Sequence, residues 1–138
     1  MLSRPMPELV AAFEEGTLPR AEWTHEAHLA VALSFWYAEN DAEKALQRMR
    51  AAIQRYNAAT GVIDGPMSGY HETLTIFWVR HVGAFANADG GSLEEVFPRL
   101  LQEWGDSKAP LRFYSKRTLM NPMSRARFVP PDMAPFEV

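Results

Sequence analysis

The sequence predicts an all-α fold, a single-domain bundle of five or six helices. Two segments carry apolar residues at the i, i+3, i+4 and i+7 spacing of an amphipathic helix, and two others are apolar on nearly every side. Signals for β-strands are weak throughout. A length of 138 residues matches one domain, which we assign to residues 1–138.

The first predicted elements are a short helix near residues 7–15 and a longer one over about residues 24–39. In the longer segment, Leu29, Val31 and Trp36 cannot share one helical face. A helix that is apolar all round is a central one, covered by amphipathic neighbours. The segment 24–39 is therefore the first of two predicted central, buried helices.

The clearest amphipathic helix spans about residues 41–60. Asp41 is a suitable N-cap, and Gly61 stands where a helix C-terminal glycine belongs. The apolar stripe of this helix comprises Ala42, Ala45, Leu46, Met49, Ala52, Ile53 and Tyr56.

Two more long helices complete the predicted bundle. The segment 70–88 is again apolar nearly all round, which predicts the second central helix. The segment 93–104 is amphipathic, and Ser92 followed by Glu95 forms a capping box at its start.

Residues after 107 form a proline-containing tail that is basic. Asn121 and Pro122 predict the cap and the first turn of a short helix through about residue 128. Residues 108–127 carry a charge of +6 and residues 1–107 carry −7, so we expect the tail to dock onto the body. The overall charge of −3 argues against a nucleic-acid surface, which usually shows as a basic excess over the whole domain.

Composition excludes several classes of site and location. Without cysteine the chain has no disulfide, Cys-ligated zinc, iron–sulfur cluster or thiol nucleophile. The N-terminal segment lacks the apolar run of a signal peptide, and the longest strongly apolar stretch, about residues 29–38, is too short to span a bilayer. We therefore expect a cytoplasmic protein without a membrane segment.

Polar residues at the starts of the two central helices form the candidate site. His25 and His28 are three positions apart and share one side of their helix, and His71 and Glu72 begin the other helix. If both starts meet at one end of the bundle, three imidazoles and a carboxylate converge. Sets of this kind bind metals in helical bundles, so all four residues are candidate ligands of a divalent metal ion such as zinc, iron, nickel or manganese.

Two other interpretations of these side chains stay open. They can serve as caps and hydrogen-bonding partners for backbone groups at the helix ends. Alternatively, His71 forms a metal-free catalytic pair that transfers protons, with either Glu72 or His25 as its partner. The zinc-protease pattern HExxH is absent, because Thr75 stands where its second histidine belongs. His81 lies about 280° around the helix from His71, and we expect it at the surface or at an edge.

Four short motifs stand out along the chain: Trp23-Thr24-His25-x-x-His28-Leu29, Tyr70-His71-Glu72-Thr73-x-Thr75, Tyr114-Ser115 and Phe128-Val129-Pro130-Pro131-Asp132. Together they resemble a group of short bacterial all-helical proteins of unknown function. The resemblance covers the chain from about the second helix to the C-terminus. It implies one complete domain of a bacterial cytoplasmic protein, and it brings no activity, cofactor or partner.

The leading functional hypothesis is a polar His/Glu cleft at one end of the bundle that binds a metal or acts as an enzyme. The alternative is a non-catalytic module that binds a small molecule or a protein and whose histidines are structural. The residues by themselves name no substrate, reaction or oligomeric state.

Overall fold

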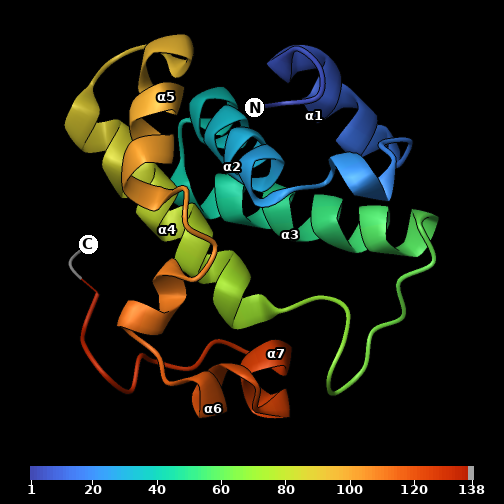
Figure 1. Cartoon of the computed structure of the whole chain (residues 1–138), viewed down its shortest axis with the longest axis vertical. Coiled ribbons are helices and arrows are strands. Elements are labelled where there is room, and N and C mark those ends of the chain that lie inside the picture. The colour runs from blue at the N-terminus through green and yellow to red at the C-terminus, as the bar shows by residue number, and fades with distance from the viewer. Residues whose placement is uncertain (137–138) are drawn as a thin grey trace.

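The computed structural model describes residues 1–136, and within them it confirms an all-α, single-domain bundle (Figure 1). This part of the chain has seven α-helices, two short 3₁₀ turns and no β-strand. The elements are α1 (Met6–Glu15), a 3₁₀ turn (Arg20–Glu22), α2 (His25–Glu39), α3 (Ala42–Ala59), α4 (Glu72–Asp89), α5 (Leu93–Trp104), a 3₁₀ turn (Ala109–Arg112), α6 (Lys116–Leu119) and α7 (Pro122–Ala126). None of the helices in residues 1–136 is long and apolar enough to cross a membrane.

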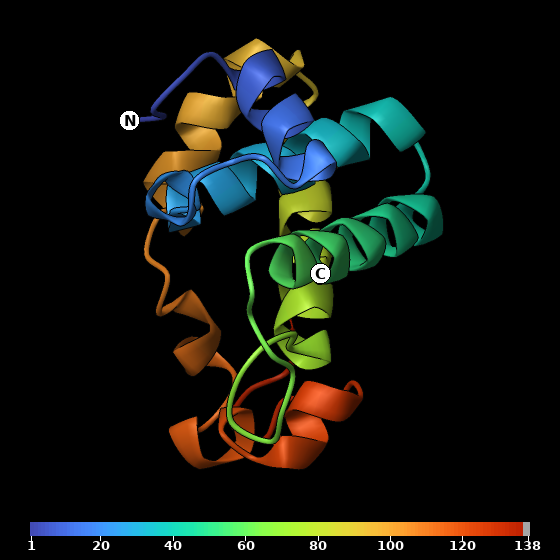
Figure 2. The ribbon, with the colours of Figure 1, turned by 90° about the vertical axis from the view of Figure 1, so that its right-hand side faces the viewer.

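Helices α2 and α4 are the central helices of the bundle. Helix α2 contacts α1, α3, α4 and α5, and α4 contacts α2, α3, α5 and α7. Leu29 and Val31 point to opposite sides of α2, yet each is completely buried. Figure 2 shows α4 running from the layer of the N-terminal helices down to the layer of α6 and α7. The first turn of α4 therefore lies where the tail packs.

Side-chain caps fix the starts of three helices, and those of α3 and α5 are the predicted ones. The Thr24 hydroxyl accepts a hydrogen bond from the Ala27 N–H at the start of α2, and the Asp41 carboxylate does the same for Lys44 in α3. At the start of α5, Ser92 forms the expected capping box with its partner three residues later. These side-chain oxygens satisfy N–H groups that have no partner inside their own helix.

A glycine sets the close approach of the two central helices. A side chain at Gly83, in the middle of α4, would place its Cβ 2.4 Å from the Trp36 ring of α2. The absence of a Cβ lets the indole lie directly on the α4 backbone. The contact between α2 and α4, which brings their first turns to one pocket, depends on this small residue.

The C-terminal tail is docked on the start of α4 by aromatic burial and hydrogen bonds. Tyr114 is completely buried, and its hydroxyl donates to the Val129 carbonyl at 2.7 Å. The Thr73 hydroxyl donates to the Arg127 carbonyl and accepts from the Val129 N–H. The six basic side chains of residues 108–127 form no ion pair with any carboxylate of residues 1–136. Docking of the tail therefore does not depend on charge pairing with the acidic body.

The expectation that His81 lies at the surface is wrong. Its side chain is only 2% exposed and lies among the rings of Phe77, Trp104, Phe113 and Phe136. Helical spacing correctly separates His81 from the first turn of α4. However, α5 and the tail cover the side of α4 that carries His81, a side that a lone helix would expose.

Candidate functional site

His25 and His28 stand on the first turn of α2, and their rings lie near one another. The ring centroids are 6.4 Å apart and the ring planes differ by 14°. The Nε2 atom of His25 is hydrogen-bonded to the Trp104 carbonyl at 3.0 Å, which ties this ring to the end of α5. The Trp78 ring of α4 packs against His25 with its centroid at 4.7 Å. The pair is thus held between α2, α4 and α5.

His28 has a buried ring nitrogen without a hydrogen-bond partner. Its Nδ1 is inaccessible to solvent and contacts no donor or acceptor among the described residues. Such groups are rare, since leaving a buried polar atom unsatisfied costs about 1–3 kcal/mol. Burial, together with the neighbouring His25, lowers the pKa of His28 to about 4. The imidazole is therefore neutral at pH 7 and can both donate and accept a hydrogen bond.

Acidification is expected to destabilise the protein through His28. An unfolded histidine titrates near pH 6.5, so between pH 6.5 and 4 the unfolded chain binds a proton that the folded chain excludes. Stability is retained above this window and is lost as the pH falls through it, by about 2 kcal/mol between pH 7 and pH 5. Urea unfolding at the two pH values measures this loss. A His28→Leu variant with the same loss would contradict the assignment.

His71 is the N-cap of α4 rather than a residue of its first turn. Its Nδ1 accepts a hydrogen bond from the Leu74 N–H at 3.1 Å, so the proton of the neutral ring is on Nε2. That Nε2–H group donates to the Leu119 carbonyl of the tail at 2.9 Å. Burial lowers the pKa of His71, and the charge of Arg125 adds to the effect. Both ring nitrogens are therefore engaged with the backbone.

Glu72 turns away from the histidines towards α3. The two guanidinium nitrogens of Arg50 donate to its carboxylate oxygens at 2.9 and 2.7 Å, and the Tyr70 hydroxyl donates at 2.5 Å. Partial burial raises the pKa of Glu72, but these hydrogen bonds outweigh it and lower the pKa below its ordinary value. Glu72 is thus a paired carboxylate, and its side chain lines a separate cavity of about 500 Å³ with Arg50 and Arg125.

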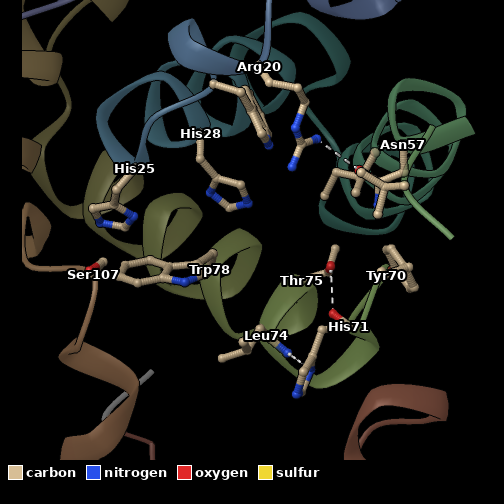
Figure 3. Close-up of a pocket in the computed structure, with 14 residues that line it drawn as sticks. Arg20, His25, His28, Asn57, Tyr70, His71, Leu74, Thr75, Trp78 and Ser107 are labelled. Atoms are coloured by element: carbon tan, nitrogen blue, oxygen red, sulfur yellow. Dashed lines mark hydrogen bonds between the residues drawn. The ribbon is translucent and has the colours of Figure 1, made fainter. Parts of the chain in front are cut away.

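The three histidines at the helix starts line a common pocket of about 350 Å³, whereas Glu72 does not line it. Figure 3 shows the His28 ring directed into this space above Trp78, and the His71 ring turned away from it. Among residues 1–136 no group of three or more histidine, aspartate or glutamate side chains is arranged to hold a metal ion. The four candidate ligands are therefore divided between two cavities and do not surround one point.

Two polar residues of the pocket escaped the sequence analysis. Arg20 lies in the 3₁₀ turn before α2, and its guanidinium points into the pocket, where Nη1 lies 3.4 Å from the Asn57 Oδ1 (Figure 3). Asn57 is 8% exposed and stands on the buried side of α3. A signal for Asn57 was present, because it follows Ile53 by four positions and so continues the apolar stripe with a polar residue. Arg20 had none, since its position depends on how the turn folds.

Comparison of the chain with protein-family models, curated proteins and solved structures finds no match.

Proposed function

We propose that the pocket between α2, α3 and α4 binds a small organic molecule, with Arg20 and His28 as its polar anchors. The observation that carries the proposal is the neutral imidazole of His28, whose ring points into the cavity and whose Nε2 has no hydrogen-bond partner among residues 1–136 (Figure 3). A polar group without a protein partner at the wall of a cavity is one that a ligand can hydrogen-bond. The enclosed Nδ1 is out of reach from the pocket, so Nε2 is the nitrogen that would make this bond.

The other residues that line the pocket also suit a small organic molecule. Trp23 and the small exposed part of Trp78 supply apolar surface, while Asn57 and Thr75 supply polar groups at separate points. Ligand pockets are typically mostly apolar, with a few convergent polar groups, and enclose about 300–1,000 Å³. The volume of about 350 Å³ suits a ligand of metabolite size.

A titration of the ¹⁵N-labelled protein with a library of small acids, alcohols and amides tests the proposal. The indole N–H signals of Trp23 and Trp78 are expected to shift. The Trp36 signal serves as an internal control, because that ring lines a different cavity, near α3. A His28→Leu variant should bind its ligands at least about tenfold more weakly, whereas an Arg55→Gln variant on the exposed face of α3 should not differ from the parent. Absence of any shift at Trp23 and Trp78 contradicts the proposal.

A divalent metal ion is the second candidate occupant, because His25, His28 and His71 line the same pocket. Coordination by all three requires that His71 release the Leu74 N–H or the Leu119 carbonyl. Elemental analysis of untagged protein after incubation with zinc, manganese, nickel or iron tests this alternative. One retained ion per chain that is lost in His28→Leu would favour the metal over an organic ligand.

A further inference from the structure

We propose that the ligand of this pocket is a small organic carboxylate with a flat, unsaturated ring. The inference rests on the proposed function, since it specifies the class of molecule that the same pocket takes. It follows from the charge of the lining, the positions of two helix ends and the shape of the walls.

The charge of the pocket favours an anion. Arg20 brings a full positive charge, and none of the described residues that line the pocket is acidic. Arg20 forms no ion pair with a carboxylate of residues 1–136, whereas four other arginines of the same region do. Its contact with Asn57, at 3.4 Å, uses Nη1 alone and leaves the other guanidinium N–H groups for a ligand. The guanidinium carbon also lies 5.3 Å from the centre of the Tyr56 ring. A negatively charged group on the ligand would give this exposed arginine an ion-pair partner.

The helix ends add to the positive potential and favour a carboxylate over a phosphate. His25 and His28 come from the first turn of α2, and Leu74 and Thr75 from that of α4, so the positive ends of both helix dipoles face the pocket. The first turns are already capped by Thr24 and His71, which leaves Arg20 as the main anion donor. One planar guanidinium can pair with either group through two parallel hydrogen bonds. Its single positive charge balances a carboxylate but leaves part of the charge of a phosphate dianion unbalanced.

Aromatic walls favour a flat body for the ligand. The Trp23 ring is held by stacking on Phe13, with centroids 4.0 Å apart and planes 14° from parallel. The His28 ring lies between the two tryptophans, 5.5 Å from Trp23 and 6.4 Å from Trp78. Rigid aromatic surfaces stack on other flat π-systems with centroids about 4.5–7 Å apart. A planar ring would therefore contact these walls more fully than a puckered aliphatic ring of the same size.

Four simple probes separate these features: benzoate, benzamide, cyclohexanecarboxylate and inorganic phosphate. Benzamide retains the ring without the charge, cyclohexanecarboxylate retains the charge without the flat ring, and phosphate carries charge alone. We expect benzoate to shift the Trp23 and Trp78 indole signals with an affinity at least about tenfold above that of each other probe. In an Arg20→Gln variant benzoate should bind no more tightly than benzamide. The matched Arg55→Gln variant should keep the preference of the parent protein.

The four probes test the carboxylate, the flat ring and the pocket separately. Equal binding of benzamide and benzoate, or retention of the preference in Arg20→Gln, would overturn the carboxylate inference while the pocket itself stood. Equal binding of cyclohexanecarboxylate would overturn the requirement for a flat ring. Failure of benzoate to bind also contradicts the inference, and the proposed function then depends on whether other library members shift Trp23 and Trp78.

Discussion

Replacing Tyr114 by alanine is expected to lower the free energy of unfolding by about 3–5 kcal/mol, as truncation of a buried aromatic side chain does. The ring is completely buried under the tail, and its hydroxyl bond to Val129 is lost as well. The free energy of unfolding of a native protein is typically about 5–15 kcal/mol. This single substitution therefore removes a large part of the stability of the fold. Chemical denaturation followed by circular dichroism measures the loss.

Two further variants identify what holds the tail in place. Tyr114→Phe keeps the buried ring and removes the hydroxyl, so it should cost about 1 kcal/mol. A double Lys116→Gln and Arg117→Gln variant should change stability by less than about 0.5 kcal/mol, because both side chains are exposed and without ion pairs in residues 1–136. A large loss in the charge variant, with little in Tyr114→Ala, would show that charge and not aromatic burial anchors the tail.

Replacing His71 by alanine is expected to cost about 2–4 kcal/mol. The variant loses the N-cap of α4, which is typically worth about 1 kcal/mol, and leaves the Leu119 carbonyl without its donor, which costs about 1–3 kcal/mol. Asparagine is a good N-cap but is too short to reach the tail. His71→Asn should therefore lose about half as much stability as His71→Ala.

The His71→Asn and His71→Ala variants also separate a structural role of His71 from a catalytic one. If His71 acted by proton transfer alone, both variants would keep the stability of the parent protein. Equal melting temperatures for the parent, His71→Asn and His71→Ala would therefore contradict the capping role that the hydrogen bonds indicate.

Periodicity and caps predicted the bundle well because they depend on neighbours within one turn. The segment 93–104 matches α5, and the limits of α3 lie one residue inside the expected 41–60. Helices that are apolar all round were expected to be central, and α2 and α4 are. For these elements, burial and local hydrogen bonding lead to the same structure.

The candidate site was harder to predict because its polar side chains are governed by distant partners. Spacing within α2 places His25 and His28 together, and the structure puts both on the pocket. The direction of Glu72 depends instead on Arg50, 22 residues earlier, and the engagement of His71 depends on Leu119, 48 residues later. The spacing of residues within one helix does not predict contacts between residues this far apart in the sequence. The same limit applies to His81, whose burial depends on where the tail docks.

The hydrogen bonds of Thr73 have a consequence for the order in which the molecule assembles. They join the first turn of α4 to residues 127 and 129, more than 50 positions further along the chain. During synthesis α1 to α3 emerge first, but the start of α4 has no tail to pack against until residues 127 and 129 have left the ribosome. The part of the pocket wall that the start of α4 provides is therefore supported only after the tail has been synthesised.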